Sequence, residues 1–124
     1  MIDTFGKVKI FVNNQDEAKA FWVEKLGFVA KIDETEGPLR WIEVAPSEDE
    51  FATLILYDKN LMLSEDPYAN VGHPSIILST KDVKKSYEEM KAKGIEVGEL
   101  MVFPYATMFS FKDQDNNEYL LREN

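Results

Sequence analysis

The chain has 124 residues, with 23 acidic and 14 basic side chains, one histidine and no cysteine. Its length suits one domain or two small fused modules, and its 44% hydrophobic share can furnish a core. The lack of cysteine excludes disulfides, thiolate-bound zinc and iron–sulfur clusters. The formal charge of −9 argues against nucleic acid as a partner, because phosphate binding needs a clustered positive surface. No apolar run is long enough to span a bilayer, so we expect a cytoplasmic protein with no membrane partner.

The first half of the chain reads as a strand, a helix and three further strands. Alternating side chains predict a strand over Lys7–Val12. A helical stripe follows and ends at Gly27, where a residue of left-handed conformation belongs. Three strand-like runs come next, at Phe28–Glu34, Leu39–Ala45 and Phe51–Tyr57.

The second half repeats this order at an offset of about 66 residues. We expect a strand over His73–Leu78 and then a helix, capped by the hydroxyls of Ser79 and Thr80, that ends at Gly94. Three strand-like runs again follow, at Ile95–Phe103, Thr107–Lys112 and Glu118–Arg122.

These patterns predict an α+β fold in which one βαβββ module is used twice. The modules cover about 5–57 and 73–123, and together they form a single domain over 1–124. The stretch 58–72 is rich in turn-forming residues and is interpreted as the linker between them.

Two local motifs carry a family resemblance. Phe21–Phe28 places an aromatic pair before a Leu-Gly-Phe exit from the helix, and Pro104–Ala106 is followed by the strand and turn of Phe109–Glu118. In that turn, Asn116 can adopt the positive φ that tight turns often need, because asparagine tolerates this conformation almost as glycine does. The chain thus resembles the vicinal oxygen chelate superfamily of glyoxalases, bleomycin-resistance proteins and extradiol dioxygenases. The resemblance implies a curved mixed sheet, a glyoxalase/bleomycin-resistance-like cup, and a homodimer.

The resemblance also implies where a metal would bind. Metal-using members carry ligands at four equivalent strand positions, which fall on Lys7, Ile55, His73 and Leu120. Among these, His73 alone offers a donor of the expected kind, because a protonated lysine and two aliphatic side chains do not ligate a divalent ion. We therefore expect no metal and no cofactor.

The same positions imply which residues face the cup, since side chains alternate between the two faces of a strand. The implied lining combines apolar walls with a few polar groups, which is typical of a small-molecule pocket. The candidates for binding the substrate are Lys7, Phe11, Trp41, Tyr57, Ser75, Tyr105, Glu118 and Arg122.

Two functions stay open. The first is a metal-free small-molecule binder, similar to the bleomycin-resistance proteins that sequester cationic aromatic drugs. The alternative is a metal-independent or atypical-metal lyase, isomerase or dioxygenase-type enzyme of the same superfamily. In the enzyme, His73 or Glu43 is the candidate catalytic base. A purely structural role suits His73 equally well.

Overall fold

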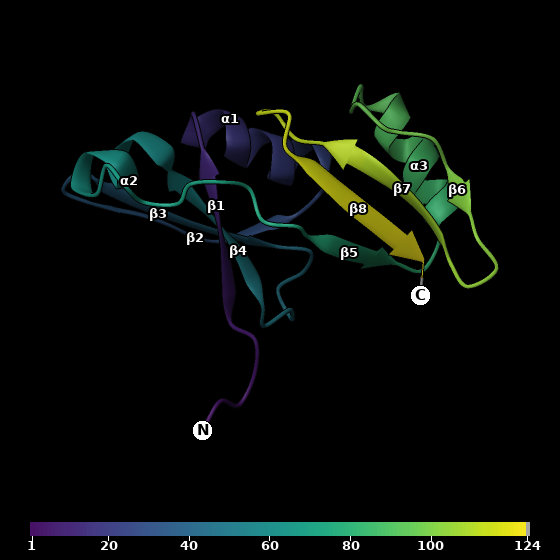
Figure 1. Cartoon of the computed structure of the whole chain (residues 1–124), viewed down its shortest axis with the longest axis horizontal. Coiled ribbons are helices and arrows are strands. Elements are labelled where there is room, and N and C mark those ends of the chain that lie inside the picture. The colour runs from purple at the N-terminus through teal and green to yellow at the C-terminus, as the bar shows by residue number, and fades with distance from the viewer. Residues whose placement is uncertain (124) are drawn as a thin grey trace. The chain divides into compact units, whose positions relative to one another are not determined.

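The computed structural model describes residues 1–123 (Figure 1). The chain divides into two compact units, Met1–His73 and the residues from Pro74 onward. Within the described residues, no helix is both long and apolar enough to cross a membrane.

The first unit is a four-stranded mixed sheet with strand order β1-β4-β3-β2. Strands β1 and β4 run parallel, whereas β2, β3 and β4 pair antiparallel. A helix connects β1 to β2, and its last turn is a π-helix in which the Leu26 N–H bonds to the Phe21 carbonyl. The elements are β1 (Lys7–Val12), α1 (Gln15–Ala20), the π-helical turn η1 (Phe21–Lys25), β2 (Val29–Glu36), β3 (Leu39–Ala45), β4 (Thr53–Asp58) and α2 (Lys59–Glu65).

The first sheet buries one face beneath α1 and η1, as its alternating sequence predicts. Trp22 is fully buried and packs edge-on against Phe21, with ring centroids 5.5 Å apart. The opposite face carries the polar and aromatic side chains that the alternation assigns to it. The buried face and its helix contribute Ile10, Val12, Ala18, Phe21, Trp22, Ile42, Val44, Leu54 and Leu56 to the core.

The second unit has the same topology, with strand order β5-β8-β7-β6 and a parallel pair, β5 and β8. Figure 1 shows helix α3 alongside β7 and β8, and the Tyr87 ring of α3 packs edge-on against Phe109 at 5.1 Å. The α+β fold built on a repeated βαβββ order is therefore confirmed. Its elements are β5 (Ile77–Thr80), α3 (Val83–Ala92), β6 (Met101–Val102), β7 (Thr107–Lys112) and β8 (Glu118–Glu123).

Three positive backbone angles confirm the turn assignments. Gly27 and Gly94 follow the two helices with φ of 72° and 75°, and Asn116 makes its turn with φ of 63°. Glycine adopts this region without steric cost, and asparagine is among the few other residues that tolerate it.

The strand expected over Ile95–Phe103 is wrong in its extent. Only an isolated bridge from Val97 to Phe111 and the two residues of β6 pair regularly. Between them, the Gly98 N–H donates to the Ser110 carbonyl at 2.8 Å, and a Cβ at Gly98 would lie 2.5 Å from the Ser110 hydroxyl oxygen. This contact keeps the register of the Val97 bridge, whereas Met101 pairs with Met108 one residue out of that register, so the ladder is irregular between Gly98 and Met101.

Three other boundaries also differ from the prediction. The strand expected over His73–Leu78 begins only at Ile77. The stretch interpreted as a linker contains α2, which is capped by the Asp58 carboxylate. Helix α3 is capped by Asp82, whose carboxylate accepts from the Lys85 N–H, because Thr80 lies too far before the first turn and bonds to the Asp82 N–H instead.

The side chain of Gln15 holds two strands of the first sheet at the point where their pairing ends. Strands β3 and β4 pair only at Glu43 with Ile55 and at Val44 with Leu54. Beyond these pairs, the Gln15 amide donates to the carbonyl of Arg40 on β3 and to that of Leu56 on β4, each at 2.8 Å. One amide on the first helix therefore bridges both strands.

We predict that Gln15→Leu lowers the free energy of unfolding by about 2 kcal/mol, since it removes two hydrogen bonds and leaves two carbonyls without a donor. Chemical denaturation measures the change. The control Glu17→Gln, on the same first turn, should stay within about 0.5 kcal/mol of the parent protein. Equal stability of Gln15→Leu and the control would contradict the bridging role.

Candidate functional site

A buried carboxylate organises the face of the first sheet that points away from α1. Glu43 on β3 is only 3% exposed. One of its oxygens accepts from the Lys7 ammonium at 2.6 Å and from the Thr53 hydroxyl at 2.8 Å. Its other oxygen accepts from the Trp41 indole N–H at 2.7 Å. The three donors come from β1, β4 and β3, so this carboxylate joins three strands.

Burial and hydrogen bonding act on Glu43 in opposite directions. Burial raises the pKa of the carboxyl, whereas the hydrogen bonds from Lys7, Trp41 and Thr53 lower it, and the net pKa lies below the ordinary value of 4.5. The group is therefore an ionised carboxylate at neutral pH, with both oxygens already engaged. A general base works best with a pKa closer to neutrality. This geometry favours an anchoring role for Glu43 over the catalytic role considered from the sequence.

Three aromatic rings lie beside this carboxylate. Tyr57 is central and makes edge-on contacts with Phe11 at 5.9 Å and with Trp41 at 6.3 Å. The Lys9 ammonium lies 4.5 Å from the centroid of the Tyr57 ring, in cation–π contact. The sequence prediction placed Lys7, Phe11, Trp41 and Tyr57 on one face, and these contacts bring them together with Glu43.

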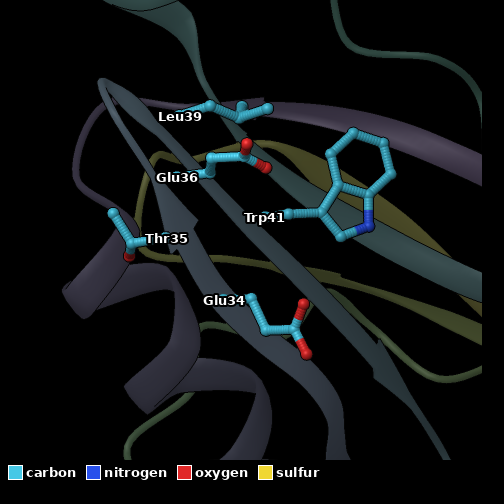
Figure 2. Close-up of a pocket in the computed structure, with 5 residues that line it drawn as sticks. All are labelled: Glu34, Thr35, Glu36, Leu39 and Trp41. Atoms are coloured by element: carbon cyan, nitrogen blue, oxygen red, sulfur yellow. The ribbon is translucent and has the colours of Figure 1, made fainter.

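The Trp41 ring also lines a cavity of about 320 Å³ at the end of the β2–β3 hairpin. Figure 2 shows the carboxylates of Glu34 and Glu36 extending to the same side of the hairpin as the indole, while Thr35 points away. The pairing of Glu34 with Trp41 and of Glu36 with Leu39 puts these side chains on one face. The cavity is of a size that suits a small organic molecule.

Glu34 and Glu36 were not among the residues proposed from the sequence. The predicted strand ended at Glu34, whereas β2 continues to Glu36 and turns back through a two-residue loop with Gly37 at φ of 59°. The dipeptide Gly37-Pro38 between two strand-like runs is a hairpin signal that fixes this register.

The other candidates belong to the end of the first unit and to the second unit. His73, half-buried, is the last residue of the first unit and lies outside any strand, and Ser75 is exposed before β5. Glu118 and Arg122 are exposed on β8, on the face opposite the buried Tyr119 and Leu121. Tyr105, on the β6–β7 connection, is 70% exposed and stacks on Phe103 at 5.4 Å.

The residues at the family's metal positions do not fit a divalent ion. Lys7 is an ammonium paired with Glu43, and Leu120 has no donor atom. Strand register aligns Tyr57, rather than Ile55, with Leu120, because Phe11 pairs with Tyr57 as Ile77 pairs with Leu120. Burial raises the pKa of the Tyr57 phenol, with the charges of nearby acidic groups adding to it, so this oxygen also stays protonated. Within residues 1–123, no three His, Asp or Glu side chains gather as metal ligands do.

We predict that Glu43→Gln loses about 2 kcal/mol of stability at neutral pH, less than the loss of a fully buried pair costs, because Lys7 is half exposed. The folded-state pKa of Glu43 is depressed, so its contribution is present above pH 4.5 and is lost as the pH falls below that value. The free energy of unfolding, measured by denaturation between pH 7 and pH 3, should therefore fall more steeply with decreasing pH for the parent protein than for Glu43→Gln. The exposed-site variant Glu48→Gln should show the same pH dependence as the parent. If the stability of Glu43→Gln fell with pH in parallel with the parent, the stabilising role of the Glu43 carboxylate would be refuted.

Comparison with known proteins shows the family to which the chain belongs. Residues 4–120 match the family described as the Glyoxalase/Bleomycin resistance protein/Dioxygenase superfamily. The uncharacterized protein YetH of Bacillus subtilis (strain 168) is 38% identical over 125 residues, which cover 99% of this chain and 100% of the relative.

Two solved structures are similar along nearly their whole length. UcmS2 is 29% identical with a TM-score of 0.81, and the match covers 98% of each chain. TnmS3, an antibiotic binding protein from Streptomyces sp. CB03234, is 25% identical with a TM-score of 0.82, over 98% of this chain and 96% of that one. Since the family match spans most of its length, the chain belongs to the Glyoxalase/Bleomycin resistance protein/Dioxygenase superfamily.

Proposed function

We propose that this protein binds a small organic molecule with a planar aromatic ring, without a metal, on the face of the first sheet that carries Trp41. One observation carries the proposal: the Trp41 indole, fixed by its bond to the buried Glu43, forms a wall of the cavity at the hairpin end. A ring held in one orientation offers a stacking surface whose ordering cost is already met in the free protein.

Binding suits this face better than catalysis. The carboxylate that the enzyme hypothesis needs as a base accepts hydrogen bonds from three donors and has a lowered pKa. The lyase, isomerase or dioxygenase alternative, with His73 as its base, stays a prediction. The similarity to TnmS3, described as an antibiotic binding protein, supports a role in binding.

The two tryptophans of the chain allow a direct test. Trp22 is fully buried in the core, whereas Trp41 lines the cavity. We predict that titration with bleomycin or with neutral 2-naphthalenemethanol shifts the indole N–H signal of Trp41 in a proton–nitrogen NMR spectrum and leaves that of Trp22 in place. The variant Trp41→Phe assigns the two signals.

Trp41→Ala should weaken binding of the same probes by about three- to tenfold, the effect of losing one aromatic contact, as measured by calorimetry because the variant lacks the Trp41 signal. The matched control is Tyr68→Ala, which removes an aromatic side chain that is 96% exposed. If no aromatic probe moves the Trp41 signal up to its solubility limit, the proposed function is wrong.

We also propose that the protein forms a homodimer. The support is the family resemblance together with large apolar side chains that lie exposed in the first unit, Ile2 at 91%, Phe5 at 92% and Phe51 at 66%. Sedimentation equilibrium should give twice the 14.3 kDa mass of the chain, and Ile2→Ser with Phe5→Ser should shift the protein toward monomer. A monomeric mass at every concentration would count against the dimer. The expected cytoplasmic location stays a prediction.

A further inference from the structure

Strand register orders the site face, meaning the side of the first sheet that carries Glu43, into rows. One row runs from Lys9 through Ile55 to Glu43, and the next runs from Phe11 through Tyr57 toward Trp41. The Trp41 row continues onto β2 at Glu34, and Glu36 lies one row beyond it, opposite Leu39. The site face therefore has lysines at its β1 side, aromatic rings in the middle and the carboxylates of Glu34 and Glu36 at its β2 side.

The acidic end carries uncompensated negative charge. Glu34 and Glu36 are exposed, and their side chains line the cavity beside the Trp41 ring (Figure 2). Within residues 1–123, neither carboxylate makes an ion pair. Two acceptor groups beside an indole face provide both hydrogen bonding and ring contact for a positively charged nitrogen.

The basic end carries uncompensated positive charge. Glu43 neutralises Lys7, with which it forms an ion pair at 2.6 Å. The Lys9 ammonium instead lies over the Tyr57 ring, and in the described part of the chain no carboxylate pairs with it. A ring contact uses one side of an ammonium group and leaves N–H donors for an anion. Lys9 is therefore the positive pole of the site face.

We propose that the preferred ligand is a dipolar aromatic molecule, with a cationic group placed at Glu34 and Glu36, an anionic group at Lys9, and its ring against Trp41. This inference rests on the proposed function and names its ligand class. A purely cationic ring system leaves Lys9 without a partner, and a purely anionic one leaves the two carboxylates without a partner, so each makes only one of the two charge contacts. Strands β1 and β2 lie three strand spacings apart, about 14 Å, and Lys9 and Glu34 lie one row apart along the strands, so their backbones are about 16 Å apart. The long side chains narrow that gap.

A matched naphthalene series tests the charge pattern. The probes are 2-naphthalenemethanol, 2-naphthylmethylamine, 2-naphthoate and the dipolar 6-(aminomethyl)-2-naphthoate, each titrated into the full-length protein with the Trp41 signal as readout. Each charge should tighten binding by about two- to fivefold, as exposed ion pairs do, so the dipolar probe should bind about tenfold more tightly than the neutral one. Added salt should reduce this preference.

Variants separate the two poles. Glu34→Gln with Glu36→Gln should remove the tighter binding of the dipolar probe relative to 2-naphthoate, because the cationic group loses its partners. The tighter binding relative to 2-naphthylmethylamine should remain, because the anionic group still contacts Lys9. Lys9→Met should have the reverse effect. The controls are Glu48→Gln with Glu50→Gln, which make the same charge change in the exposed β3–β4 loop, and Lys84→Met on the exposed side of α3.

The dipolar ligand class and the aromatic binding site can fail separately in these experiments. If the neutral probe shifts Trp41 but all four probes bind equally, the dipolar ligand class is overturned and the aromatic site stands. The dipolar class is equally overturned if the control variants change the preferences as much as the pole variants do. If no probe reaches Trp41, the proposed function and this inference fall together.

Discussion

The buried charge of Glu43 sets the conditions for everything else on the site face. A carboxylate that is 3% exposed must be paired and hydrogen-bonded, because an isolated ion in such a place costs far more than the fold can offset. Its partners come from three strands, and one of them is the ring nitrogen of Trp41. The orientation of the indole is thus a consequence of satisfying a buried charge, and the wall of the cavity follows from that orientation.

The two units show how a duplicated fold can diverge in chemistry. Both have the same strand order, with a parallel pair at the same place. In the first unit the row at the centre of the face holds Phe11, Tyr57 and Trp41. The corresponding row of the second unit holds Ile77, Leu120 and Ser110. The backbone repeats but the aromatic row does not, so the chemistry of the site face is particular to the first unit.

The sequence was most informative where local rules decide the outcome. The predicted bounds of β1, β3 and β7 agree with the structure, since short alternating runs between turn residues determine them. Alternation also assigned Lys7, Trp41 and Glu43 to one face, because it depends only on the period of a strand.

What sequence reasoning missed depends on tertiary contacts. No local signal shows that Gln15 reaches two carbonyls from other strands, or that the pairing register shifts by one residue between Gly98 and Met101. The acidic end of the site face was missed for a different reason. The strand boundary was drawn two residues short, and Glu36 then fell in a turn instead of opposite Leu39.

The Gln15 bridge gives α1 a mechanical connection to the site face. The carbonyls that it holds belong to Arg40 and Leu56, the residues immediately before Trp41 and Tyr57. One side chain of the first helix therefore holds together the backbones that carry the two rings. A helix residue that need not touch the ligand can in this way adjust the width of the aromatic surface, so variation in ligand preference among related chains can arise from behind the sheet.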